Sequence, residues 1–82
     1  MQLSYDASRN IAYLRLRESV GVQVGTVRLS DEVNVDLAPD GTVYGIELLN
    51  AKAQLRAADG ERFVVVDEVA GHRIEVPLPE VA

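Results

Sequence analysis

Residues 33–51 read VNVDLAPDGTVYGIELLNA, and this stretch decides the fold class. Apolar residues alternate with small or polar ones over 33–37 and again over 44–48, which is the period of two of a half-buried strand. The pair Asp40-Gly41 lies between the two runs and is a strong turn signal. The stretch therefore predicts two antiparallel strands joined by a tight turn.

The length of the turn decides which residues share a face of this hairpin. A three-residue loop at 39–41 would scatter the large apolar residues over both faces, whereas a loop of even length gathers them on one. The even register pairs Leu37 with Tyr44, Val35 with Ile46, and Val33 with Leu48. We therefore expect the even register, with Asp36 and Glu47 on the opposite, solvated face and Asn34 facing Glu47.

The rest of the chain shows further strands and one helix. Alternation or apolar runs predict strands near 3–5, 12–16, 27–29, 63–66 and 74–78. Asn50 is the expected N-cap of a short helix that packs through Ala51 and Leu55 and ends at Gly60. We expect residues 1–82 to form a single mainly β (α+β) domain, an antiparallel β meander of about six to seven short strands with one short helix.

Composition excludes several classes of function. The chain has 82 residues and a formal net charge of −5, which disfavours a nucleic-acid binder. Its apolar runs are far shorter than a membrane span, and its N-terminus does not resemble a signal peptide. It has no cysteine, so disulfides and thiolate metal sites are excluded. These features predict a soluble cytoplasmic protein.

Two stretches resemble a known family. YDASRNIAYLRL, residues 5–16, and the hairpin stretch 33–51 are similar to the two motifs of the domain of unknown function 2283. The resemblance covers residues 1 to about 56, including the start of the helix, and leaves 57–82 as a C-terminal β extension. Asn10 and Asn50 stand where the family usually has aspartate. The resemblance implies a small bacterial or archaeal β protein without assigned catalytic residues, and a toxin-like neighbouring protein as a hypothetical partner.

Asp36 and Glu47 are the strongest candidates for chemistry, either as an acid/base pair or as a divalent-metal site. Two carboxylates and one amide supply too few oxygens for a hard cation. We expect them instead to pair across strands with arginines, namely Arg15, Arg17 and Arg28. His72 has no nucleophile motif beside it, and the glycines of VGVQVG lack the lysine of a phosphate loop. The sequence therefore predicts no catalytic residue, metal or cofactor.

The favoured hypothesis is a non-enzymatic protein–protein interaction or assembly module, and the alternative is a small metal-dependent enzyme using Asp36 and Glu47. A chain this short buries little core and has no disulfide to compensate, so we expect a homodimer or larger assembly. Tyr13, Val64 and Val66 are the expected interface residues. Tyr13 shares a face with arginines, and the two valines lie in a run that is apolar on both faces.

Overall fold

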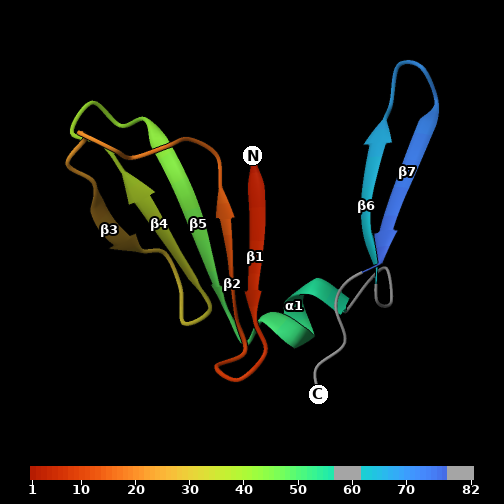
Figure 1. Cartoon of the computed structure of the whole chain (residues 1–82), viewed down its shortest axis with the longest axis horizontal. Coiled ribbons are helices and arrows are strands. Elements are labelled where there is room, and N and C mark those ends of the chain that lie inside the picture. The colour runs from red at the N-terminus through yellow and green to blue at the C-terminus, as the bar shows by residue number, and fades with distance from the viewer. Residues whose placement is uncertain (57–61, 78–82) are drawn as a thin grey trace.

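The computed structural model describes residues 1–56 and 62–77, which form seven strands and one helix (Figure 1). In chain order these are β1 (Gln2–Asp6), β2 (Ile11–Arg15), β3 (Gly25–Arg28), β4 (Val33–Leu37), β5 (Val43–Leu49), α1 (Ala51–Arg56), β6 (Arg62–Asp67) and β7 (His72–Pro77). All strand pairs are antiparallel. The expected mainly β fold with one short helix is confirmed. The expected helix end at Gly60 lies outside the described residues.

The first five strands form one sheet in the order β1-β2-β5-β4-β3. β1–β2 is one hairpin and β3–β4–β5 is a run of consecutive neighbours, and the pairing of β2 with β5 joins them. The segment between β2 and β3 crosses one end of the sheet to reach its far edge (Figure 1). Sequence neighbours β2 and β3 are therefore separated by two strands.

The expected register of the β4–β5 hairpin is confirmed over most of its length. Val35 lies opposite Ile46 and Val33 opposite Leu48, while Asn34 faces Glu47 and Asp36 faces Gly45. The large apolar residues thus share one face, as the burial argument requires.

The expected even loop and the Leu37–Tyr44 pair are wrong. The loop has three residues, because the Ala38 amide donates to the Thr42 carbonyl at 2.9 Å and Leu37 faces Val43. A β-bulge then leaves Tyr44 without an opposite residue and restores the register at Asp36. The Tyr44 carbonyl points to the β2 side of β5 and accepts the amides of Leu16 and Arg17 at 2.9 and 3.3 Å. The pairing of β2 with β5 thus continues past Arg15 and holds the segment that follows β2.

The register gives the five-stranded sheet two unlike faces. One face carries aliphatic side chains and the ring of Tyr5 across all five strands, and we call it the apolar sheet face. Its central row is Leu3, Leu14, Ile46, Val35 and Val27, and a neighbouring row is Tyr5, Ala12, Leu48 and Val33. The Tyr5 hydroxyl is buried without a hydrogen-bond partner among the described residues. The other face is mostly polar and carries the carboxylates of β4 and β5.

The helix α1 covers only one end of the sheet. It follows β5 directly and contacts β2, where Ala12 and the first helical residue Ala51 have no exposed surface. Two alanines let helix and strand approach closely. Among the described residues, the other buried apolar side chains are Val35 and Ala38, and no large side chain is fully buried. No helix in these residues has the length and apolar character to span a membrane.

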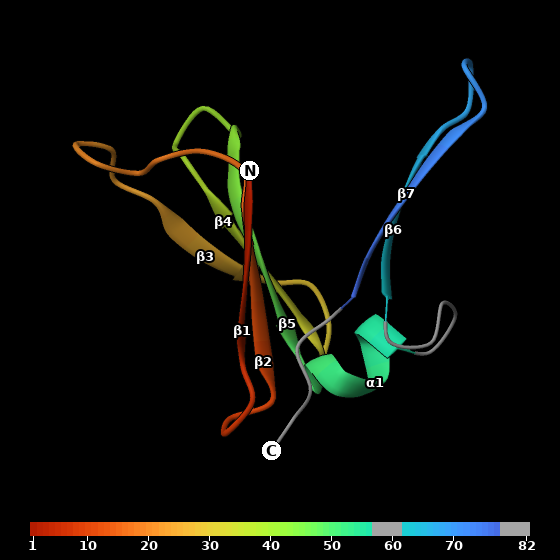
Figure 2. The ribbon, with the colours of Figure 1, turned by 45° about the vertical axis from the view of Figure 1, so that its right-hand side comes forward.

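Strands β6 and β7 form a separate two-stranded hairpin. In both views it stands apart from the five-stranded sheet, with α1 between them (Figures 1 and 2). Its register places Phe63 opposite Val76 and Val65 opposite Ile74, so these four side chains share one face. The other face carries the ion pairs of Glu75 with Arg62 and Arg73, at 3.3 Å each. We call the first of these the apolar hairpin face.

Candidate functional site

Asp36 on β4 is held by two hydroxyl groups, one from the neighbouring strand β3 and one from β2 on the far side of β5. The Tyr13 hydroxyl on β2 donates to Asp36 Oδ2 at 2.6 Å, and the Thr26 hydroxyl on β3 donates to Asp36 Oδ1 at 2.7 Å. The second carboxylate, Glu47, accepts from Asn34 Nδ2 at 2.9 Å. Asp36 and Glu47 therefore each have a neutral partner inside the sheet.

The expected pairing of these carboxylates with arginines is wrong for Arg15 and Arg28. Arg15 donates to Gln2 and forms an ion pair with Glu18 at 3.2 Å. Arg28 pairs with Asp31 in the turn after its own strand at 2.9 Å. Local partners are close in sequence and need little side-chain ordering, which explains why the exposed arginines turn away from the sheet centre.

Gly45 is what allows Tyr13 to reach Asp36. On β5, Tyr13 lies opposite Glu47, whereas Gly45 is the residue opposite Asp36 of β4. The Tyr13 side chain therefore runs diagonally across Gly45 to reach Asp36. A Cβ atom on Gly45 would collide with the Tyr13 ring. Gly45 itself is buried although it has no side chain. An aromatic ring thus covers the glycine of a neighbouring strand and bridges β2 to β4.

The protonation of Tyr13 follows from this position. Desolvation, followed by the hydrogen bond to Asp36, raises the pKa of Tyr13 to about 12. A raised pKa in the folded state means that this hydrogen bond contributes to stability below pH 10 and is lost as the pH rises toward 12. Tyr13 therefore stays protonated near neutral pH and acts as a structural donor, not as an acid.

The start of helix α1 is held from a distance in sequence. The Asn10 carbonyl accepts the Ala51 amide at 3.0 Å, and Asn10 Oδ1 accepts the Lys52 amide at 2.7 Å. The expectation that the Asn50 side chain caps the helix is therefore wrong. Asn50 has the N-cap position, but its φ of 50° is left-handed, and its side chain accepts from Asn10 Nδ2 at 3.3 Å. The two asparagines that depart from the family's usual aspartate are thus hydrogen-bonded to each other.

Glycine substitutions separate these two asparagines. Both have positive φ, which glycine adopts without strain, so the substitution removes the side chain alone. Asn10→Gly should lower the free energy of unfolding by about 1 kcal/mol, because the Lys52 amide loses its acceptor. Asn50→Gly should change it by less than about 0.5 kcal/mol, because no backbone amide depends on that side chain. Urea denaturation measures both values, and equal losses would contradict the assignment of the cap to Asn10.

The structure places the expected interface residues in different surroundings. Tyr13 is half-buried and engaged with Asp36, which accounts for an aromatic residue on a polar face without any partner protein. Val64 and Val66 lie on the ion-paired face of the β6–β7 hairpin, opposite Glu75 and Arg73. None of the expected interface residues lies on the apolar hairpin face. A hairpin with its turn before His72 pairs Phe63 with Val76 and Val65 with Ile74. The alternation of side chains along the two strands would then have predicted this apolar face.

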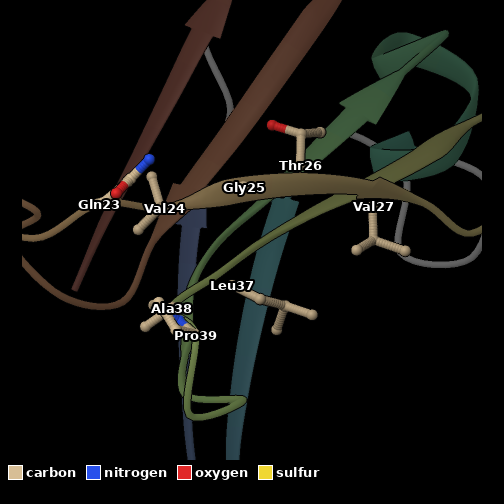
Figure 3. Close-up of a pocket in the computed structure, with 8 residues that line it drawn as sticks. All are labelled: Gln23, Val24, Gly25, Thr26, Val27, Leu37, Ala38 and Pro39. Carbon is tan, nitrogen blue, oxygen red and sulfur yellow. The ribbon is translucent and has the colours of Figure 1, made fainter.

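A hollow of about 510 Å³ lies at the β3–β4 corner of the sheet (Figure 3). Val27, Leu37 and Ala38 project to the same side of β3, and Thr26 projects to the other. The hollow is therefore a continuation of the apolar sheet face and is lined mainly by apolar side chains. It offers space for an apolar group and no charged side chain to bind an ion.

His72 and the acidic side chains do not form a metal-binding cluster in the described part of the chain. His72 is the exposed first residue of β7 and lies opposite Asp67. No group of three or more histidine, aspartate or glutamate side chains in residues 1–56 and 62–77 has the spacing of a metal site. Asp6 accepts the Ser8 hydroxyl and then amides of its own turn, and these hydrogen bonds lower the pKa of Asp6. The side chain of Thr42, followed by its amide, lowers the pKa of Asp40 in the same way. These acids stabilise turns.

The comparison with protein families identifies one match. The family model described as Protein of unknown function (DUF2283) matches residues 2–52, in agreement with the resemblance of the two motifs. The match includes the five-stranded sheet and the start of α1, and it ends before β6. Neither a curated protein nor a solved structure matches the chain.

Proposed function

Since the chain belongs to the DUF2283 family of proteins of unknown function, we propose from its own surfaces that it is a non-enzymatic protein–protein interaction and assembly module. The observation that carries this proposal is the apolar sheet face, which extends over five strands. Within residues 1–56 and 62–77, α1 contacts the sheet at one end of β2. Val27, at the far edge of this face, is 44% exposed. Because the chain has no cysteine, the proposed compartment is the cytoplasm.

Burial energies support an interaction role for this face. Each large aliphatic side chain that moves from water into a contact contributes about 1.5–3 kcal/mol when burial is complete. A contiguous apolar surface on a soluble protein is therefore typical of a binding site. The opposite face is polar and satisfies its own carboxylates, so it has much less to gain from a partner.

The alternative, a metal-dependent enzyme using Asp36 and Glu47, finds less support in the geometry. Both oxygens of Asp36 already accept hydroxyl groups, and Glu47 accepts an amide. A metal ion would have to displace these donors and would find too few other oxygens to complete its coordination.

A thermal-shift titration tests this alternative. We expect the melting temperature to stay unchanged when Mg²⁺, Mn²⁺ or Zn²⁺ is added, because a ligand raises it only when it binds the folded state. A rise that increases with metal concentration and disappears in Asp36→Asn would favour the enzyme.

Affinity capture from the native host tests the interaction module. The baits are the tagged wild-type chain, Val27→Lys on the apolar sheet face, and Ser4→Lys on the polar face as the matched control. A toxin-like protein encoded beside this chain is the specific heterologous candidate that the family resemblance implies. We expect the wild type and Ser4→Lys to retain a protein, either another copy of the chain or a second protein, and Val27→Lys to lose it. Equal capture by all three baits would overturn the assignment of function to this face.

A further inference from the structure

The chain has two apolar surfaces that expose side chains to solvent. One is the apolar sheet face, with its hollow at the β3–β4 corner. On the sheet, Val35 is buried and Ile46 half-buried, while Val27 at the β3 edge is 44% exposed. The other is the apolar hairpin face, where Val65, Ile74 and Val76 are 48%, 62% and 50% exposed and Phe63 is half-buried. Neither surface carries a charged side chain within these rows. Each is thus the kind of surface that the other could cover.

The solvent-exposed area of the chain is larger than that of a compact monomer of the same mass. The chain exposes 5940 Å², whereas a compact monomer of this mass exposes about 4,800 Å². The excess of about 1,100 Å² exceeds the roughly 800 Å² that each partner contributes to a standard interface. The radius of gyration is 14.2 Å, against about 12 Å for a compact domain of this length.

Within one chain the two surfaces are kept apart. The β6–β7 hairpin stands away from its own sheet in both views, and α1, which contacts both β2 and β6, lies between them (Figures 1 and 2). A second copy removes this obstacle, because its hairpin approaches the sheet from outside.

We propose that two copies of this chain form a reciprocal dimer in which the β6–β7 hairpin of each copy covers the apolar sheet face of the other. This proposal rests on the proposed interaction function and names its partner. A two-fold axis makes the two contacts identical. The β6 and β7 strands have six residues each, comparable with the four to seven of the sheet strands, so the contact resembles the face-to-face packing of a β-sandwich.

The electrostatics of the chain agree with this orientation. The ion pairs of Arg62 and Arg73 with Glu75 lie on the outer hairpin face and stay in water in the dimer. The hydrogen-bonded carboxylates Asp36 and Glu47 lie on the outer face of the sheet. On the apolar hairpin face the charged side chain is Asp67, which lies opposite His72 in the row beside the turn. Two chains of net charge −5 therefore meet through the rows of Phe63 and Val65, which carry no charge.

Neighbouring valines provide the first arm of the test. Val65 and Val66 are 48% and 53% exposed but lie on opposite hairpin faces. Light scattering on a sizing column should give the wild type and Val66→Lys twice the monomer mass of 8.9 kDa. Val65→Lys and Val27→Lys should each run as monomers of 8.9 kDa. A wild-type dimer that Val66→Lys dissociates and Val65→Lys leaves intact would overturn the proposed orientation.

Mixing the two monomeric variants provides the second arm. A mixed pair of Val65→Lys and Val27→Lys chains has one contact in which hairpin and sheet are both unaltered, so the mixture should recover dimer that neither variant forms alone. Tags of different mass identify the mixed species. A dimer held by hairpin against hairpin, or by sheet against sheet, has no unaltered contact in the mixture. No recovery would overturn the reciprocal arrangement.

A monomeric wild type would overturn the proposal, and its melting behaviour would then separate the causes. If Val65→Lys lowers the melting temperature of a monomer at all protein concentrations, the hairpin packs on its own sheet, and the proposed interaction function fails too. If Val65→Lys leaves that temperature unchanged, both apolar surfaces are open. The dimer is then excluded, while the interaction function stands with a different protein as partner.

Discussion

Gly45→Ala is expected to lower the free energy of unfolding by about 2–3 kcal/mol, which is unusual for a glycine in a strand. The new methyl group would occupy the place of the Tyr13 ring, which then has to swing away from the sheet. Tyr13 would lose its packing, and its hydroxyl would lose the bond to Asp36. Urea denaturation at fixed protein concentration measures the loss.

The same substitution in a Tyr13→Ala background should reverse its sign. Without the ring, alanine is the better residue in a strand interior and should stabilise by about 0.5–1 kcal/mol relative to glycine. The double-mutant cycle therefore isolates the contact between Tyr13 and Gly45. Additive costs for the two substitutions would show that Gly45 is needed for another reason.

Ile46→Ala is expected to lower the free energy of unfolding by about 2–3 kcal/mol, because it removes the centre of the apolar sheet face. Ile46 pairs with Leu14 on one side and Val35 on the other, so the lost methyl groups leave a gap between three strands. Ile46→Val should cost less than about 1 kcal/mol, since it removes only one methyl group. Thermal and urea denaturation of both variants measure the difference.

Asp36→Asn is the control on the opposite face of the same hairpin. It keeps one oxygen that accepts a hydroxyl group, and we expect a loss of less than about 1 kcal/mol. If Ile46→Ala cost no more than Asp36→Asn, the register of β4 against β5 would be contradicted.

Much of this fold was predictable from residue patterns alone. Alternation along 33–37 and 44–48 assigned Val35 and Ile46 to one face and Asp36 and Glu47 to the other, and the structure agrees. The physical reason is that side chains alternate between the two faces of a strand. Burial of one face therefore constrains the register. The two family motifs likewise predicted the match over residues 2–52.

The hydrogen-bonded groups of the polar face and of the helix start were decided by tertiary structure. Asn10 caps a helix that begins more than forty positions later, and Tyr13 reaches Asp36 across a glycine of a third strand. No local pattern encodes these pairs. β5 follows both β2 and β4 in the sequence, yet it lies between them in the sheet. Periodicity predicts which face a residue occupies, whereas the order of strands in space determines which partner it meets there.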